Sequence, residues 1–494
     1  MVKPTIGLEI HVQLATATKM FCSCANDPHD TTPNTNVCPV CMGHPGTLPV
    51  PNQKAIDLVL KTGIALGCSV NTHSKFDRKN YFYPDLPKGY QITQYDQPLC
   101  FEGRMTVLLA DQSNRNQEEG GAGTTVRIRR IHIEEDTGRL QHEGQHSLVD
   151  YNRAGVPLME LVTEPDFHSG EEASAFAQEL QLTLRYLEVS NADMEKGEMR
   201  VEANVSVSAT DTLGQKVELK NLNSFKSVRD SIDFEIERQT ALVEKGQVVV
   251  HETRGWHVEK RETFIQRTKE TEADYRYFPE PDMPPLEFDG AYIKAITDSL
   301  GELPAQRRAR FLDDYALPTK HIDTLVSNKE LAEYFEGVVS ELPETEQGLN
   351  ADEVKQGTQL AANYVLTHVL KMVQGDILST LHEKISQENF AEFIAYIVKG
   401  VVSSTGAQTL LAKMYETGGD PTELLKSLDL TQVSGEGELQ AIVSGVISEQ
   451  PKAAGDYRSG KTEVLKFLVG KVMAASKGKA NPQVAEKLLK EALK

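Results

Sequence analysis

The chain has 494 residues, of which 39% are hydrophobic and 25% charged, a composition typical of a soluble globular protein with about two to four domains. It contains no apolar run of the roughly 20 residues that cross a bilayer, so we exclude a membrane span. The segment Met1–Thr5 has neither the apolar core of a secretory signal nor the pattern of a transit peptide. We therefore expect a cytoplasmic protein.

Charge is distributed unevenly along the chain. The formal net charge is −20, yet residues 451–494 carry ten Lys or Arg against four Asp or Glu, a net of +6. The acidic body disfavours indiscriminate coating of nucleic acid. The basic C-terminal segment is compatible with a docking surface for an anion or RNA, or with a solubilising helix face.

Residue patterns in roughly the first 290 positions predict strands mixed with helices. Residues 5–14 alternate apolar and polar side chains, which predicts a half-buried strand. Residues 200–220 alternate in the same way on both sides of a turn-like segment, which predicts a hairpin. Residues 173–187 carry apolar side chains at helical spacing. This mixture lacks regular β-α alternation and favours an α+β domain over a doubly wound sheet.

Two breaks divide the rest of the chain. The proline-rich segment 279–285 is a plausible boundary, and beyond it residues 360–373 and 390–402 carry broad apolar stripes typical of helices. The second break lies at Val402–Gly406. We therefore predict a mixed domain over residues 1–290, a helical domain over 291–405 and a small helical tail over 406–494.

Four of the six cysteines form a compact cluster in the sequence, at Cys22, Cys24, Cys38 and Cys41. Four thiolates around one Zn²⁺ suit a closed tetrahedral site, which has no open position for catalysis. We therefore expect a structural zinc ion bound by these four side chains.

Other interpretations of the cysteines remain open. A redox pair and ordinary buried thiols are the alternatives, although a cytosolic chain disfavours structural disulfides. His29 and His44 are close enough in sequence to replace a cysteine ligand. Cys68 and Cys100 are expected to be buried apolar residues.

Carboxylates and one histidine occur on predicted strands. Glu9 and His11 lie two residues apart on the polar side of the first strand. Glu134 and Glu135 end another β-type run, where adjacent side chains point to opposite faces if the strand continues. Glu160 stands alone in an apolar strand, where an isolated carboxylate costs several kcal/mol unless it is paired or bound to metal.

Three acids and one histidine from separate strands suit Mg²⁺, which serves phosphoryl transfer. The alternatives are a solvated strand face for Glu9 and His11 and a salt bridge for Glu160. The chain has no phosphate-binding loop of the P-loop or protein-kinase type. The residues alone therefore indicate a metal-dependent phosphotransferase or ligase with another kind of nucleotide site.

Several longer stretches resemble the GatB family, the B subunits of tRNA-dependent amidotransferases. Those in the N-terminal half are Ile6–Val12, Lys75–Pro84, Gln91–Pro98, Glu134–Gly138 and Glu218–Ser224. Those further along are Asp274–Asp282, Phe467–Gly470 and Lys477–Pro482.

The resemblance implies an N-terminal cradle domain similar to the glutamine synthetase and guanidino-kinase fold, followed by a helical domain and a tail that grips tRNA. It also implies a reaction, in which ATP phosphorylates the side-chain carboxylate of Glu-tRNA(Gln), Asp-tRNA(Asn) or both. Ammonia then displaces phosphate. The implied enzyme is an ATP-dependent carbon–nitrogen ligase within a glutamine-hydrolysing complex.

The same resemblance implies roles for individual residues. Glu9, His11, Glu134 and Glu160 would bind Mg²⁺ at the kinase centre. The route by which ammonia arrives would include Lys79, Lys88 and Glu135. The tail would contact tRNA through Lys477 and Lys479.

The implied partners are an amidase subunit (GatA) and a small subunit (GatC), which form a heterotrimer with this chain. No membrane is expected among its partners. The amidase subunit would release ammonia, because no glutaminase constellation is evident in this chain. A non-catalytic zinc-containing tRNA-binding scaffold is the main alternative function, and a free-standing ligase of small carboxylates is another.

Overall fold

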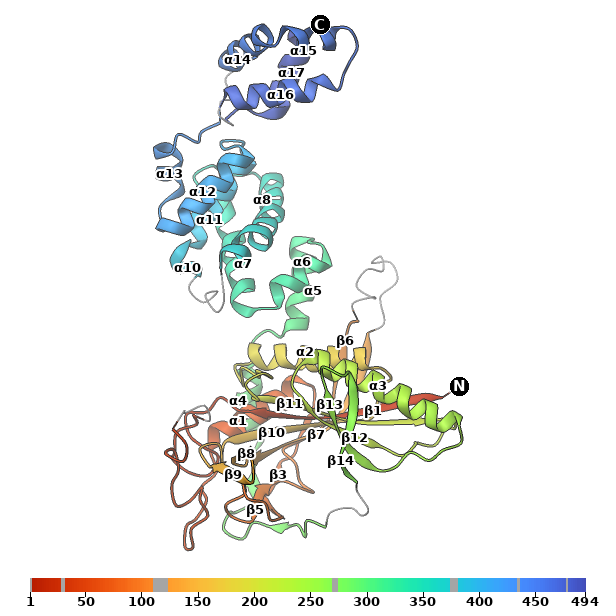
Figure 1. Cartoon of the computed structure of the whole chain (residues 1–494). Coiled ribbons are helices and arrows are strands. Elements are labelled where there is room, and N and C mark those ends of the chain that lie inside the picture. Colours follow the sequence, from red (N-terminus) through yellow and green to blue (C-terminus); the bar gives the residue numbers. More distant parts are fainter. Residues whose placement is uncertain are drawn as a thin grey trace. The chain divides into compact units, whose positions relative to one another are not determined.

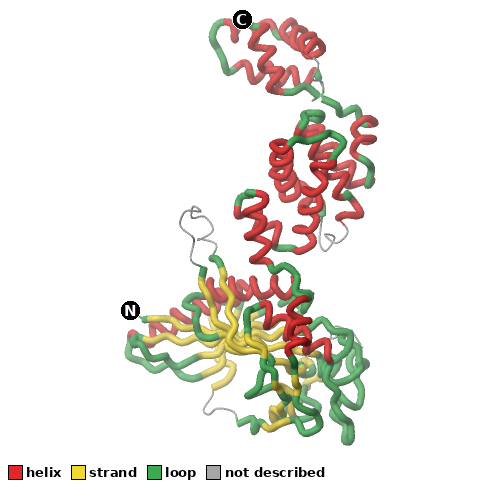
Figure 2. Tube along the Cα trace, turned by 180° about the vertical axis from the view of Figure 1, so that it is seen from behind, coloured by secondary structure: helices red, strands yellow, loops and turns green. Residues whose placement is uncertain are grey.

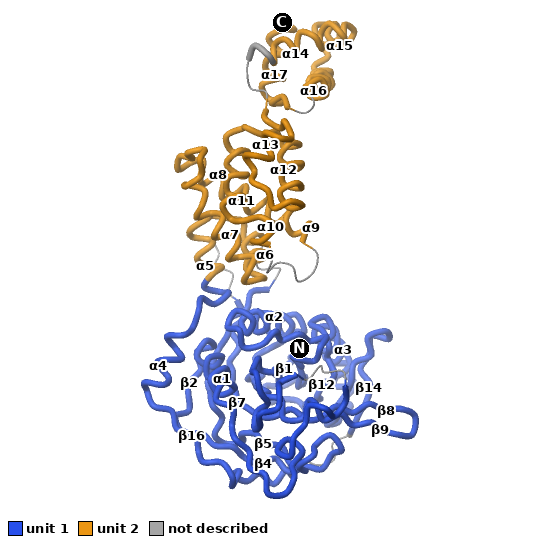
Figure 3. Tube along the Cα trace, turned by 90° about the vertical axis from the view of Figure 1, so that its left-hand side faces the viewer, with its two compact units in different colours: residues 1–306 blue, residues 307–494 orange. Residues whose placement is uncertain are grey.

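The computed structural model describes residues 2–27, 32–109, 123–268, 274–373, 381–432, 436–476 and 479–494. The chain divides into two compact units, residues 1–306 and 307–494 (Figure 3). No helix within the described ranges is both long and apolar enough to cross a membrane.

The first unit is built on one large sheet. Its nine described strands follow the spatial order β14-β13-β12-β11-β1-β10-β7-β6-β2, and every adjacent pair is antiparallel except β12 with β13. Their bounds are β1 (Lys3–Gln13), β2 (Ser69–Val70), β6 (Cys100–Val107), β7 (Thr124–Glu135), β10 (Pro157–Thr163), β11 (Met199–Ser208), β12 (Val217–Leu222), β13 (Glu252–His257) and β14 (Glu262–Thr268).

Smaller sheets and helices complete this unit (Figure 1). The short strands are β3 (His73–Ser74), β4 (Asp77–Asn80), β5 (Tyr90–Thr93), β8 (Arg139–Glu143), β9 (His146–Asp150), β15 (Phe278–Pro279) and β16 (Leu286–Glu287). The helices are α1 (Gln53–Ala65), α2 (Gly170–Tyr186), α3 (Phe225–Glu244) and α4 (Gly290–Asp298). The unit continues past the proline-rich segment 279–285, and Tyr292 of α4 donates a hydrogen bond to Asp57 of α1.

The second unit is helical throughout its described elements (Figure 2). Its helices are α5 (Pro304–Tyr315), α6 (Thr319–Val326), α7 (Lys329–Glu341), α8 (Ala351–Tyr364), α9 (Leu370–Met372), α10 (Leu381–Lys384), α11 (Gln387–Val398), α12 (Ser404–Thr417), α13 (Pro421–Ser427), α14 (Glu436–Glu449), α15 (Pro451–Arg458), α16 (Val464–Ala475) and α17 (Pro482–Ala492). A 3₁₀ turn covers Leu342–Glu344 and a π-helical turn covers Val365–Val369. Helices α14–α17 share a hydrophobic cluster that includes Leu439, Leu468 and Leu489.

The structure confirms the α+β prediction for the first unit and the helical prediction beyond it. The alternating segment 5–14 forms β1, the expected hairpin forms β11 and β12, and the expected helix forms α2. Helix α2 begins where Ser169 Oγ accepts a hydrogen bond from the Glu172 amide at 3.2 Å, a standard N-cap.

The side chains of strand β1 alternate between the hydrophobic core and the polar face of the sheet. Ile6, Leu8, Ile10 and Val12 are at most 1% exposed and belong to the hydrophobic cluster formed with α2 and α3. Because side chains alternate along a strand, the residues between them point to the other face. Burial of these four side chains in the core therefore determines that the alternate residues of β1 lie on the polar face, where a ligand could reach them.

We expect Leu8→Ala to lower the free energy of unfolding of the first unit by about 2–5 kcal/mol, because it leaves a cavity in this core. The neighbouring Glu9→Gln should cause no such loss. Trp256, the single tryptophan, lies in β13, so its fluorescence during denaturant unfolding reports on this unit. Equal destabilisation by both variants would contradict the assigned orientation of β1.

Candidate functional site

The polar face of the sheet carries a cluster of carboxylates and imidazoles from three adjacent strands. Strand β10 lies between β1 and β7, and its Glu160 is directly opposite His11 on one side and His132 on the other. Directly opposed residues of neighbouring strands share a face and lie close together. Glu9 and Glu134 are two residues from these histidines, on the same face.

The four predicted residues Glu9, His11, Glu134 and Glu160 therefore converge. The Nε2 atom of His11 lies 3.4 Å from Glu160 Oε2, 3.8 Å from Glu9 Oε1 and 3.9 Å from Glu134 Oε1. Glu134 and Glu160 are buried, and Glu9 is partly exposed.

His132 is a member of the cluster that the sequence patterns did not predict. Its Nε2 atom lies 3.3 Å from Glu160 Oε2 and 3.9 Å from Glu134 Oε2, and its side chain is 3% exposed. The spacing in the sequence does place His132 on the same strand face as Glu134, because the two are two residues apart, like Glu9 and His11. This spacing alone could not identify His132 as a site residue, because its partner Glu160 lies on a different strand.

Burial and charge compete to set the protonation of the cluster. Burial would lower the pKa of His11, but the Glu160 hydrogen bond and the surrounding carboxylates raise it to about 9. His132 behaves in the same way, with a pKa raised to about 9. Burial and the neighbouring Glu160 charge raise the pKa of Glu9 to about 7. The histidines hold the pKa of Glu160 well below its usual value despite burial.

The donor set fits a divalent cation. Glu9, His11 and Glu160 form one trio, and His132, Glu134 and Glu160 form another, with the ligand atoms of each trio within 4.8 Å of one another. Octahedral ligands at about 2.1 Å from an ion are about 3–4 Å apart, so the contacts of 3.3–3.9 Å leave room for an ion between them. Carboxylates suit Mg²⁺, and two imidazoles also accommodate a transition metal.

Lys79 of β4 lies near this cluster. Its Nζ atom is 5.0 Å from the centre of the Tyr275 ring and 5.9 Å from that of Tyr81. Burial would lower the pKa of Lys79, but the nearby charges of Glu134, Tyr277 and Glu160 raise it above its usual value. The structure thus brings a cation to the carboxylates.

Lys88 and Glu135 form a separate ion pair. Glu135 Oε1 also accepts a hydrogen bond from the Ile92 amide at 3.0 Å, whereas Glu134 Oε2 accepts one from Thr93 Oγ1 at 3.0 Å. The two adjacent glutamates therefore have different partners. Lys88 and Glu135 line a pocket of about 210 Å³ that the cysteine-containing loops also border.

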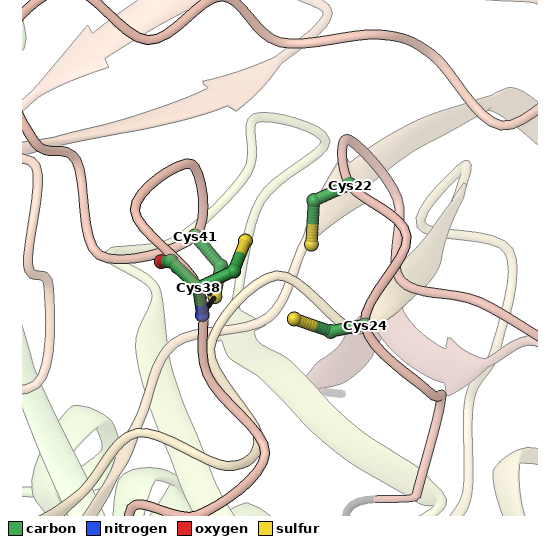
Figure 4. Close-up of side chains that lie close together, drawn as sticks. All are labelled: Cys22, Cys24, Cys38 and Cys41. Carbon is green, nitrogen blue, oxygen red and sulfur yellow. Dashed lines mark hydrogen bonds between the residues drawn. The ribbon is translucent and has the colours of Figure 1, made fainter.

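The four clustered cysteines come together from two loops (Figure 4). Their sulfur atoms all lie within 4.8 Å of one another, and tetrahedral Zn²⁺ with Zn–S bonds of about 2.3 Å needs separations of about 3.8 Å. The Cys38 amide donates a hydrogen bond to Cys41 Sγ at 3.1 Å. His44 lines the neighbouring pocket, while His29 lies outside the described residues.

Lys19 supports the metal interpretation. Its side chain is completely buried, its Nζ donates a hydrogen bond to the Asn36 carbonyl oxygen at 2.8 Å, and it lies 4.0 Å from Cys41 Sγ. A buried ammonium requires a nearby negative charge. Hydrogen bonds from Cys22 and the Cys38 amide, together with the Lys19 charge, lower the pKa of Cys41 to about 5, so Cys41 supplies that charge as a thiolate.

Of the two lysines predicted to contact RNA, Lys477 and Lys479, the structure describes only Lys479. Lys477 lies outside the described residues. Lys479 forms an ion pair with Asp429. On α16, Phe467 is 49% exposed and the Lys471 ammonium lies 5.4 Å from the centre of its ring.

Comparison with known proteins matches residues 4–294 to the GatB/GatE catalytic domain and residues 350–493 to the GatB domain. The chain belongs to the GatB family. It is 42% identical over 500 aligned residues to the B subunit of the aspartyl/glutamyl-tRNA(Asn/Gln) amidotransferase of Thermotoga maritima, with 99% of each chain covered. It is 44% identical to the proteins of the same name from Dehalococcoides mccartyi and Thermomicrobium roseum, with 99% of this chain and 98% of each relative covered. The resemblance found in the sequence motifs is thereby confirmed.

In this GatB-family chain, we expect binding of a divalent cation near pH 7 to release protons. His11, a proposed ligand with a pKa of about 9, is protonated there and must lose its proton to bind a metal, and the cation also disfavours the protonated form of the neighbouring His132, so affinity rises with pH up to about 9. Calorimetric titration of Mn²⁺ into the zinc-loaded chain, in buffers of different ionisation enthalpy, measures the protons released. Binding without proton release would contradict this protonation of the cluster.

We also expect the purified GatB-family chain to retain about one zinc ion after exhaustive dialysis. Cys38→Ser should remove it, because four sulfur ligands close the site. Cys68→Ser is the matched control, since Cys68 lies outside the cluster and should leave the zinc content unchanged. Metal analysis by mass spectrometry provides the measurement, and zinc retained by Cys38→Ser would exclude the four-cysteine site.

Proposed function

We propose that this chain is a catalytic subunit of a tRNA-dependent amidotransferase, acting as an ATP-dependent carbon–nitrogen ligase. Its substrates are Glu-tRNA(Gln), Asp-tRNA(Asn) or both. The observation that carries the proposal is the convergence of Glu9, His11, Glu134 and Glu160 on one face of the sheet. Family membership supports the substrate class, because the relatives are named for this activity.

The proposed fold of the first unit is a cradle similar to that of glutamine synthetase and the guanidino kinases. The support is a largely antiparallel sheet with helices on one face and the carboxylate cluster on the other. We retain the division into domains at residues 1–290, 291–405 and 406–494 as part of this proposal.

The reaction has two steps. In the first, the bond from the γ-phosphorus of ATP to its bridging oxygen breaks, and a carboxylate oxygen of the aminoacyl group bonds to that phosphorus. In the second, ammonia attacks the acyl carbon, inorganic phosphate leaves and the nitrogen loses a proton. The acyl phosphate supplies the leaving group that a carboxylate lacks.

The residues of the cluster would hold Mg²⁺, with Glu9, His11, Glu134 and Glu160 as ligands and His132 beside them. When bound, Mg²⁺ supplies positive charge that offsets the charge of the transferred phosphoryl group. Lys79 remains protonated because its pKa is raised, and it adds a positive charge near Glu134. Burial of these groups strengthens each electrostatic interaction relative to water.

Ammonia would come from an amidase subunit (GatA), held with a small subunit (GatC) in a heterotrimer. Lys79, Lys88 and Glu135 would lie along its route, and the pocket beside Lys88 and Glu135 supports this assignment. Zinc would stabilise the cysteine loops without joining the chemistry. The basic tail would contact the tRNA backbone, with Lys477 and Lys479 as the proposed contacts.

We expect Glu134→Gln and Glu160→Gln each to reduce amidation roughly 10²- to 10³-fold, because each removes charge from the cation site. The assay uses the assembled complex with misacylated tRNA, ATP and glutamine, and follows both ADP and amidated tRNA. Glu195→Gln is the control, since Glu195 is an exposed carboxylate outside the cluster. Normal amidation by both cluster variants would refute the proposed centre.

The same assays separate the alternatives. Tight tRNA binding by the complex without any ATP consumption would favour a non-catalytic scaffold. Full activity after deletion of residues 406–494 would favour a ligase of small carboxylates. A larger effect of Lys88→Ala on glutamine-driven than on ammonium-driven amidation would support a role of Lys88 in ammonia delivery, and equal losses would reject it.

A further inference from the structure

The cysteine cluster and the Lys88–Glu135 ion pair border the same pocket. The residues lining the pocket include Cys22 and Cys41 from the cluster, together with Lys88 and Glu135. The cluster is therefore next to the ion pair, although its expected role is only structural.

Gly43 lies close against Lys88 in the loop that carries Cys38 and Cys41. It follows Cys41 by two residues and has a positive φ of +67°. A Cβ atom placed on Gly43 would lie 2.5 Å from Lys88 Cγ and 3.1 Å from Lys88 Cα. Because real Cβ atoms do not approach so closely, only glycine allows Lys88 its present position.

The loop that carries Gly43 is held by its own hydrogen bonds and by the cysteines. The Met42 amide donates to the Cys38 carbonyl at 3.0 Å, and the Gly43 amide donates to the Val40 carbonyl at 3.0 Å. A metal ion bound by Cys38 and Cys41 would hold both ends of this turn. Such an ion would therefore restrain the position of Gly43.

A residue next to the other cysteine pair also lies near Lys88. Phe21 directly precedes Cys22, and the Lys88 ammonium lies 5.8 Å from the centre of the Phe21 ring. The Lys88 side chain, 9% exposed, therefore lies near Phe21, which precedes Cys22, and near Gly43, which follows Cys41 by two residues, while its ammonium group pairs with Glu135.

We propose that the metal-loaded cysteine cluster positions Lys88 in the pocket through Gly43 and Phe21, and so sets the efficiency of glutamine-driven amidation. Gly43 and Phe21 are positioning residues, which act through Lys88. The inference rests on the proposed role of Lys88 in ammonia delivery and assigns the zinc site a part in that step.

The first test measures the position of Lys88 without reference to activity. Acylation of Lys88 by acetic anhydride in the full chain is followed by mass spectrometry of its peptide. We expect Gly43→Ala to raise the rate several-fold while zinc content is retained, because the added methyl group displaces Lys88 from Glu135. Gly46→Ala is the matched control, since Gly46 lies in the same loop with φ +82° and a Cβ there would meet nothing within 4 Å.

A second test measures acylation of Lys88 in the wild-type chain, so it does not require a variant to fold. Removal of zinc from the wild-type chain with a chelator should also raise the acylation rate of Lys88, and restoring zinc should reverse the change. Unchanged labelling after both zinc removal and Gly43→Ala would overturn the proposal.

The proposed effect on glutamine-driven amidation is tested in the assembled complex. Gly43→Ala should lower glutamine-driven amidation several-fold more than ammonium-driven amidation. If the labelling of Lys88 rises but both amidation rates fall equally, the cluster positions Lys88 but Lys88 has no part in ammonia delivery. That outcome overturns the proposed ammonia role and leaves the kinase centre untouched.

Discussion

The candidate site depends on a balance of charge between carboxylates and histidines on one face of the sheet. Glu134 and Glu160 are buried, and an isolated buried carboxylate is costly. His11 and His132 offset that cost when protonated, which is why their pKa values rise. Glu9 is the remaining acid, and its pKa rises because it is largely removed from water and lies beside the negative charge of Glu160. Such a cluster can exchange its protons for a cation at little electrostatic cost.

The geometry of the site follows from the packing of the core. The same strand β1 that buries Leu8 and Ile10 under the helices presents Glu9 and His11 on the opposite face. A slip of one residue would bury the site and expose the core, so the two functions of the strand fix a single register. Pairing with β10 on one side and β11 on the other holds that register along the whole strand.

Sequence patterns predicted the local structure well because alternation and helical spacing are local properties. The segments carrying Glu9, Glu134 and Glu160 were predicted as strands, and they are strands. The order of those strands could not be obtained in this way, since β10 lies between β1 and β7 through contacts distant in sequence. Without that order, His132 had no visible partner. The burial of Lys19 was also hidden, because its stabilising thiolate belongs to another loop.

Two largely buried lysines lie close to the loop that carries Cys38 and Cys41, so a metal bound by the cysteines would affect more than its ligands. Lys19 approaches Cys41 directly, whereas Lys88 packs against Gly43 and pairs with Glu135. Four thiolates on one Zn²⁺ would carry a net charge of about −2, which would stabilise a buried ammonium such as Lys19. Without the metal, the lowered pKa of Cys41 leaves a single thiolate beside Lys19, so the negative charge near this ammonium would be smaller. Because a Cβ atom on Gly43 would clash with Lys88, a shift of the loop toward Lys88 would displace this lysine from Glu135.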